Sequence, residues 1–259
     1  MAVSLSSTSV ALSNTSTTAA AQEDPTTAAL NKISPALGKA HGRVQSQLQS
    51  DSTSLSQLGK YKATVSDLST AAQALSQLGS GTASVADNAK VVERFVAAYN
   101  QAITASQTGT SSEASSTLAA SRRTLMNTDT SRSQLAKLGL SRQADGTLKL
   151  DATALNKALA ASTASSTGGT SGTTASGLST LAQLGKAIGK RADSELSSTS
   201  RLATATSLFS GKTSLLKQQQ SRLLEAATQM ASQSSSTSST ASTSSGNWST
   251  QQALRKYTV

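Results

Sequence analysis

The sequence predicts an all-α protein whose long antiparallel helices form a coiled-coil-like bundle, with one small β-hairpin and disordered Ser/Thr-rich ends. Of its 259 residues, 50 are Ser, 35 are Thr and 42 are Ala, and hydrophobic residues make up only 36%. An ordinary globular domain has about 45–50% apolar residues, so this chain favours a thin, extended architecture over a large core. Three Ile and nine Val are too few for a large sheet, whereas Ala, Leu, Gln and Lys are good helix formers.

The chain begins with a predicted disordered leader, residues 1–29, followed by a long N-terminal helix within residues 30–80. Helical periodicity starts near Pro35 and carries a heptad-like apolar stripe. One position of this stripe holds Leu37, Val44, Leu58, Val65 and Ala72, with Asp51 in register, and the other holds Leu48, Leu55, Leu68 and Leu75. The interior glycines Gly38, Gly42 and Gly59 each cost about 1 kcal/mol relative to Ala, so this helix needs partners along its stripe.

Residues 85–160 are predicted to hold further helices and the hairpin. Apolar residues at three-and-four spacing, Val92, Phe95, Val96, Tyr99 and Ile103, indicate a helix over 85–107. A weaker helix is predicted over 113–137, with Leu118, Leu125 and Leu135 on its apolar face. In residues 138–151, Asp145-Gly146 separates two short segments and predicts a tight hairpin turn, because such turns need residues that tolerate positive φ. Asp151 is then placed to cap a short helix that ends near Leu159.

A flexible linker is predicted at residues 161–177, followed by a C-terminal helix hairpin at 178–231 and a disordered tail at 232–259. The first hairpin helix has Leu181, Ile188, Leu202 and Phe209 at sevens with Glu195 in register, and the second has Leu216, Leu223 and Met230. Gly211 is the expected break between these two helices.

Residues with catalytic chemistry are sparse. The chain has no Cys and one His, which excludes disulfides, thiolate nucleophiles and histidine metal clusters. His41 lies between Leu37 and Leu48, which favours a helix-face residue over a general base. The FSGKTS segment at 209–214 has Thr206 where a phosphate-binding loop requires Gly. Turn and cap roles suffice for Asp145 and Asp151, so we expect no enzyme and predict no catalytic, cofactor-binding or metal-binding residue.

The formal charge of +10 comes from 23 basic and 13 acidic residues. Basic residues never occur more than two in a row, as at Arg122-Arg123, and no aromatic residues interleave with them to form a base-stacking platform. Nucleic acid is therefore not an expected partner. No apolar run reaches the roughly 18 residues of a membrane-spanning helix, so no membrane span is expected.

Three segments carry a family pattern. Residues 135–159, LAKLGLSRQADGTLKLDATALNKAL, combine a Leu-Gly-hydrophobic strand, a Gly-Thr-Leu turn and a Leu-Asp helix start. This order resembles the C-terminal region of flagellar hook-associated protein 2, the filament cap of bacterial flagella. RFVAAYNQAI at 94–103 is similar to the helix that precedes this region in the family, through Phe95-Val96 and Tyr99-Asn100. Residues 55–78 resemble the end of the family's N-terminal helix.

The resemblance implies paired terminal helices, type III export, and a secreted structural subunit located at the bacterial flagellum. The implied partners are further copies of the chain in a homo-oligomer, filament or hook-associated subunits, and an export chaperone. In the family, a long outer-domain insert lies between the N-terminal helix and the helix that carries the Phe-Val and Tyr-Asn pairs. In this chain, only residues 79–90 lie between Leu78 and Val91. We therefore expect a shortened cap-like or axial component without the outer domains or the cell adhesion that they can mediate.

Two alternatives of other classes remain open at this point. The charge of +10 motivates a basic, helical nucleic-acid-associated protein, whose binding would depend steeply on salt. An exported effector or binding protein with extended helices would have the same sequence pattern.

Overall fold

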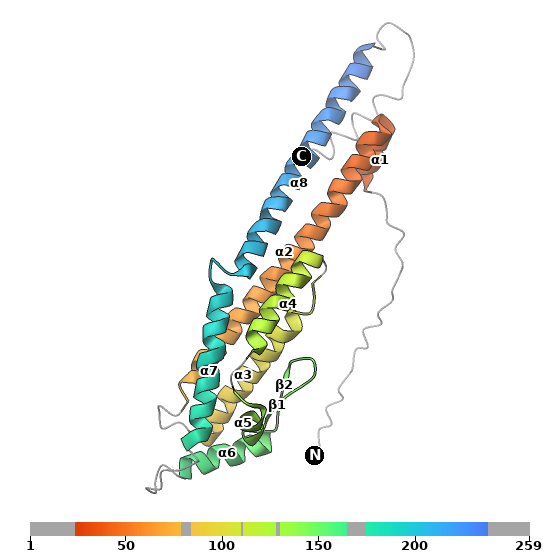
Figure 1. The fold of residues 1–259 in the computed structure, drawn as a ribbon. Helices are drawn as coiled ribbons and strands as arrows, with labels where there is room; N and C mark the ends of the chain where they lie inside the picture. The colour runs from red at the N-terminus through yellow and green to blue at the C-terminus, as the bar shows by residue number, and fades with distance from the viewer. Residues whose placement is uncertain (1–23, 79–83, 110, 128–129, 165–174, 238–259) are drawn as a thin grey trace, which may run out of the picture. The chain divides into compact units, whose positions relative to one another are not determined.

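The computed structural model describes residues 24–78, 84–109, 111–127, 130–164 and 175–237. Within these ranges lie eight helices and one two-stranded antiparallel sheet (Figure 1). The predicted fold class, long packed helices with one small β-hairpin, is therefore confirmed. The disorder predicted for the ends of the chain concerns mainly residues 1–23 and 238–259, which lie outside the described residues.

The chain divides into two units, each with its own apolar core. The first unit comprises Met1–Gly42 and Arg222–Val259, and the second comprises Arg43–Ser221. Helix α2, Pro35–Ser76, and helix α8, Arg201–Thr237, each contribute residues to both units.

In the first unit, helix α1, Pro25–Ile33, packs with the start of α2 and the end of α8. The predicted leader included the first part of this helix, so its boundary at residue 29 is wrong. Asp24 caps the helix by accepting a hydrogen bond from the Thr27 amide at 3.3 Å, and Pro25 occupies the first turn. An Asp-Pro pair is a helix-start signal because the carboxylate caps free amides and proline presets φ. Leu30, Ala227 and Ala231 are the buried residues of this core.

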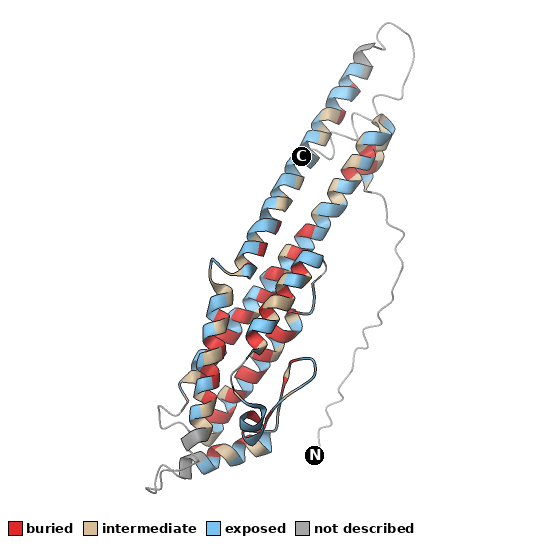
Figure 2. Ribbon diagram, viewed as in Figure 1, coloured by how far each residue is buried: buried red, intermediate tan, exposed pale blue. Residues whose placement is uncertain are grey.

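In the second unit, α2 supplies the stripe that its heptad-like pattern predicts. Its buried members are Leu58, Val65, Leu68, Ala72 and Leu75, whereas Val44, Leu48 and Leu55 are half-buried. Figure 2 shows buried residues gathered where α2 runs beside the other helices of the bundle, while much of α8 is exposed. The apolar stripe residues from Val44 to Leu55 are therefore less buried than those from Leu58 to Leu75.

Helix α3, Val85–Ala105, begins at its cap residue Ser84 and buries all five of the predicted apolar residues. The single helix predicted over 113–137 is wrong, because the structure has α4, Ser112–Met126, and α5, Arg132–Lys137. Ser131 and Gln134 form a capping box that starts α5 as a new helix. Leu118, Leu125 and Leu135 still reach one core, which explains why their spacing resembled a continuous helix.

The β-hairpin forms where Asp145-Gly146 predicts it, with strands β1, Leu140–Arg142, and β2, Leu148–Leu150. Its loop has three residues, 144–146, closed by the bond from the Gln143 amide to the Thr147 carbonyl at 2.8 Å. Gly146 has φ of 91°. The predicted tight turn is therefore a three-residue loop with Gly at positive φ.

Helix α6, Ala152–Ala164, begins after the cap residue Asp151 and runs past its predicted end at Leu159. Helix α7, Ala175–Leu196, follows. Both helices therefore extend into the predicted linker at 161–177. Its remaining part, residues 165–174, lies outside the described residues.

The predicted helix hairpin with its break at Gly211 is wrong. Gly211 lies inside α8, and the break falls at residues 197–200 between α7 and α8. Three pairs show the direction of these helices: Gly185 lies against Ala72, Asp193 bonds Ser69, and Gln220 bonds Gln45. As residue numbers rise along α7 and α8 they fall along α2, so both helices run in one direction, antiparallel to α2. Helix α8 also extends to Thr237, past the predicted start of the tail at 232.

Among the helices of the described ranges, none combines the length and the apolar character that crossing a lipid bilayer requires.

Candidate interaction surface

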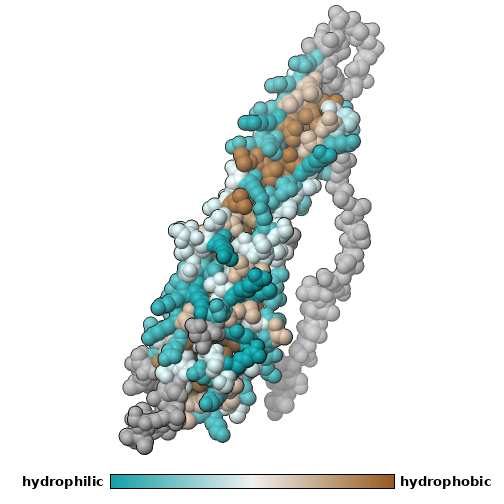
Figure 3. Space-filling view, viewed as in Figure 1, coloured by the Kyte–Doolittle hydropathy of each residue, from teal (hydrophilic) through white to brown (hydrophobic). Residues whose placement is uncertain are grey.

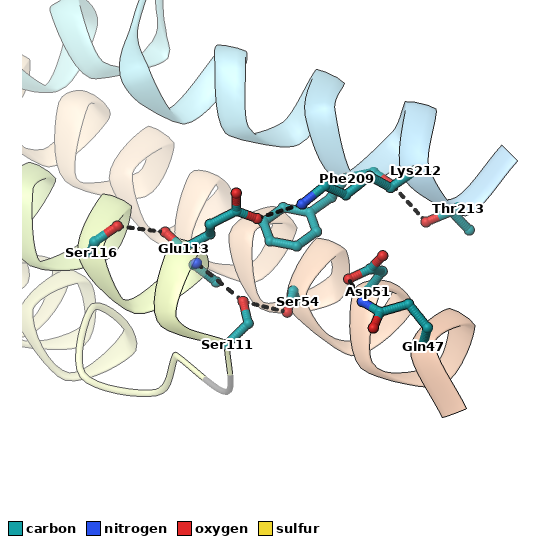
Figure 4. A network of polar contacts seen from close by, with 10 residues as sticks. Gln47, Asp51, Ser54, Ser111, Glu113, Ser116, Phe209, Lys212 and Thr213 are labelled. Atoms are coloured by element: carbon teal, nitrogen blue, oxygen red, sulfur yellow. Dashed lines mark hydrogen bonds and ion pairs between the residues drawn. The ribbon is translucent and has the colours of Figure 1, made fainter. Parts of the chain in front are cut away.

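A polar network in the second unit marks the place where α4 begins beside α2 and α8 (Figure 4). Ser111 caps α4 by accepting a hydrogen bond from the Ala114 amide at 3.2 Å, and it also accepts one from the Ser54 hydroxyl of α2 at 3.0 Å. One residue therefore both starts α4 and fixes its first turn to α2. Beyond this point toward the N-terminus, α2 no longer has α4 at its side.

Lys212 connects α8 to the same turn of α4. Its Nζ donates a hydrogen bond to Glu113 Oε2 at 2.6 Å and lies 5.3 Å from the centre of the Phe209 ring. The hydrogen bond with Glu113 raises the pKa of Lys212, and the negative charge of Asp51 adds to this effect. Lys212 therefore stays charged, and it joins an ion pair to a cation–π contact on one face of α8.

Asp51 is a buried carboxylate in the apolar stripe of α2. It is 3% exposed, and its Oδ1 accepts a hydrogen bond from Gln47 Nε2 at 2.9 Å. Its Oδ2 has no hydrogen-bond partner among the described residues. The sequence placed Asp51 in register with the leucines of the stripe, and the structure shows that it faces inward with them.

An open groove of about 500 Å³ lies between α4 and the start of α8. Its apolar lining includes Ala120, Ala205, Leu208 and Phe209, and Leu208 is 45% exposed. The charged residues at its edge are Glu113, which Lys212 pairs, and Arg201. The groove therefore offers an apolar floor with few charges.

Beyond the N-terminal end of α4, residues 43–53 of α2 and residues 210–221 of α8 form a two-helix segment. Gln45 and Gln220 join the helices through a side-chain hydrogen bond of 2.8 Å. Val44, Leu48 and Leu216 are half-buried, and Leu215 is 60% exposed. We call the groove and this segment together the open α2–α8 surface; both lie in the second unit.

Among the described residues, the groove within this surface has a mainly apolar lining, with Glu113, Arg201 and Lys212 as the charged residues beside it. No cluster of three or more potential metal ligands occurs in the part of the chain that the structure describes. His41 lies in the first unit, where its Nδ1 faces both Thr27 Oγ1 at 2.9 Å and Asp24 Oδ2 at 3.9 Å. A hydrolytic triad needs the carboxylate and the nucleophile on opposite ring nitrogens, so this arrangement does not form one.

The other residues considered in the sequence have local structural roles. Asp145 Oδ1 accepts hydrogen bonds from the Thr147 amide and hydroxyl, which lower the pKa of Asp145. Asp151 caps α6 through the Ala154 amide at 3.0 Å. Residues 209–214 lie within α8, so FSGKTS does not form a phosphate-binding loop. Asp145 and Asp151 therefore have the turn and cap roles that the sequence favoured.

The sequence did not predict the residues of this network, because the partners lie far apart in the chain. Glu113 and Lys212 lie 99 residues apart, and Ser54 and Ser111 lie 57 apart. Asp51 was the one residue that could have indicated this network from the sequence, because a carboxylate in register with a leucine stripe needs a polar partner.

No known protein-family model matches the chain, and no curated protein or solved structure matches it either.

Proposed function

We propose that the chain is a structural, secreted flagellar subunit of the axial or cap-like type, which associates with further copies of itself through the open α2–α8 surface. The observation that carries this proposal is the row of half-buried and exposed leucines on two helices that have no third helix beside them among the described residues. It includes Leu48 and Leu216, both half-buried, and Leu215, 60% exposed.

The flagellar part of the proposal rests on the resemblance to hook-associated protein 2, and one contact supports it. Two of the segments that carry the resemblance, residues 94–103 and 135–159, contact each other. Asn100 Nδ2 donates to the Leu148 carbonyl at 2.8 Å, and the Leu148 amide donates to Asn100 Oδ1 at 2.7 Å. The asparagine thus satisfies both backbone groups of Leu148 in β2, as a neighbouring strand would. Two motifs distant in the sequence therefore form one structural element.

The chain departs from that family between α2 and α3, where an outer domain would be inserted. Helix α2 ends at Ser76 and α3 begins at Val85, which leaves no room for a folded domain. The proposal is accordingly limited to an axial role, in which copies or flagellar subunits pack along helices. It assigns no adhesive function.

Energetics favour a second copy as the occupant of the surface. Burial of one Leu side chain is worth about 1.5–3 kcal/mol, and two helices alone cannot exclude water from their shared stripe. A second α2–α8 pair would bring the same leucines and would complete a four-helix arrangement.

Leu215→Asp tests self-association. Because Leu215 is 60% exposed, a charge at this position should leave the free energy of unfolding nearly unchanged. The loss of one buried Leu at a contact should weaken association by about tenfold or more. Sedimentation velocity over a concentration series measures the association, and urea unfolding measures the stability.

The matched control is Ser214→Asp, which adds the same charge at the neighbouring exposed position of α8. It should change association far less. A wild-type chain that stays monomeric over the whole series would contradict the proposal, and so would equal effects of the two variants.

A further inference from the structure

Helix α1 folds back on the start of α2 in an unusually close contact. A Cβ atom at Gly38 would lie 1.8 Å from Asn31 Oδ1 and 2.9 Å from the Asn31 backbone nitrogen. Glycine is therefore required at this point of α2. One turn further on, Thr27 lies opposite Gly42, where an added Cβ would make an ordinary contact of 3.6 Å with Thr27 Cγ2.

This contact buries the single histidine of the chain. His41 is 1% exposed, and its Nδ1 forms a hydrogen bond of 2.9 Å with Thr27 Oγ1. Among the described residues, Asp24 brings a negative charge close to it, with Oδ2 3.9 Å from Nδ1. The other charged residues of the helices in this unit are exposed; they are Lys32 on α1, Lys39 on α2, and Arg222 and Glu225 on α8.

The same helix covers the apolar core of the first unit. Leu30 of α1 is fully buried and packs with Ala227 and Ala231 of α8, and Leu37 and Leu224 lie half-buried beside them. Figure 3 shows apolar side chains gathered along the end of α8 next to α1. Removal of α1 would expose this cluster to water.

Helix α1 is short and buries few of its residues. It has nine residues, of which only Thr27, Ala29 and Leu30 are buried. An isolated helix shorter than roughly 12 residues is marginal in water, so α1 depends on its contacts with α2 and α8. Protonation of His41 would place a positive charge in a buried site, and Asp24, about one-third exposed, would offset only part of that cost.

We propose that α1 is an acid-sensitive clasp: protonation of His41 releases α1 from α2 and uncovers the apolar cluster of the first unit.

The direction of the pH effect follows from linkage. Burial lowers the pKa of His41 in the closed state, and Asp24 opposes this shift without cancelling it. The released histidine returns to about 6.5, so the open state binds the proton more tightly. The closed state is therefore favoured above about pH 6.5. As pH falls below this value, the opening equilibrium constant should rise by up to tenfold per pH unit until the closed-state pKa is reached.

Hydrogen exchange of the full chain between pH 7.5 and pH 5, corrected for intrinsic rates, tests the clasp. Amide protection in α1 should fall on acidification, while protection in α3 of the second unit should stay constant. His41→Gln is the matched control, because Gln keeps a side chain that can bond Thr27 but does not titrate. Unchanged α1 protection in the wild type, or an equal fall in His41→Gln, would overturn the proposal.

A second measurement needs no variant. Because the chain has one histidine, its imidazole gives one unambiguous NMR titration curve. We expect a midpoint below 6.5 that coincides with the loss of α1 protection, and a midpoint at or above 6.5 would overturn the clasp.

Clasp opening should also promote self-association in acid, and this consequence alone rests on the proposed function. Sedimentation at pH 7.5 and pH 5.5 should show stronger association of the wild type in acid but not of His41→Gln. If α1 opens and association does not increase, the uncovered cluster of the first unit takes no part in assembly and the clasp stands. The open α2–α8 surface lies in the second unit and is tested separately by Leu215→Asp.

Discussion

At the scale of single residues, a few side chains act on the backbone of distant segments. Asn100 satisfies the outward amide and carbonyl of Leu148, which places the hairpin against α3. Gly146 lets the hairpin reverse, because its φ of 91° is disfavoured for residues with a side chain. The hairpin therefore depends on one residue for its shape and on another for its position.

Gly146→Val should disrupt this hairpin, because a β-branched residue is strongly disfavoured at positive φ. We expect a loss of about 1–3 kcal/mol in the free energy of unfolding, measured by urea denaturation. NMR chemical shifts over residues 140–150 should also lose their strand character. Gly146→Asn is the milder comparison, since Asn tolerates positive φ better than Val. Wild-type stability in the Val variant would contradict the role of this glycine.

At the scale of helices, close approach depends on where a side chain is missing. A Cβ at Gly185 of α7 would lie 2.6 Å from the Ala72 carbonyl oxygen and 2.6 Å from the Ser76 nitrogen, both backbone atoms of α2. At Gly211 of α8 an added Cβ meets no atom within 4 Å. The two glycines therefore have opposite effects. Gly185 allows α7 to pack closely on α2, whereas Gly211 only lowers the stability of α8.

These glycines allow a paired test. Gly185→Ala should push α7 away from α2 and destabilise the protein by about 1–3 kcal/mol. Gly211→Ala should stabilise it by roughly 0.5–1 kcal/mol, because Ala is the better helix former and has room. Urea unfolding of both variants measures the difference. Destabilisation by both substitutions, or by neither, would show that the packing against α2 is described wrongly.

At the scale of the whole molecule, the chain spreads few apolar residues over long helices. Leu30, Ala227 and Ala231 form the buried core of the first unit, while the second unit draws its core from α2 through α8. A chain without Cys and with 2% aromatic residues suits export through a narrow channel in an unfolded state. This composition agrees with the proposed export route.

Export gives a whole-molecule prediction. The intact protein should appear in the culture supernatant of cells with a working flagellar export apparatus and be absent from the supernatant when the apparatus is inactivated. A cytoplasmic protein followed in parallel controls for lysis. Deletion of residues 1–23 should abolish secretion and leave thermal unfolding nearly unchanged, because this segment precedes α1. Secretion that continues without the apparatus would exclude the flagellar route.

Local sequence signals predict the type of most elements. The heptad-like stripe predicts α2, three-and-four spacing predicts α3, and Asp145-Gly146 predicts the hairpin, because each signal is local. Periodicity could not reveal the breaks at 127–131 and 197–200, since the residues on either side pack on the same core and keep their spacing. Gly211 was misread because the helix continues through an exposed position at a modest cost of about 1 kcal/mol.

Which side chains meet depends on how the distant segments pack. Glu113 pairs with Lys212 and Ser121 bonds Glu195 across 99 and 74 residues, and the clasp of α1 needs Thr27 beside His41 on an antiparallel neighbour. The direction of α7 and α8, which leaves the open α2–α8 surface exposed, is likewise a result of packing. Local propensity sets the conformation of each segment, but contacts between distant segments depend on the free energy of burying their stripes together, which no single segment encodes.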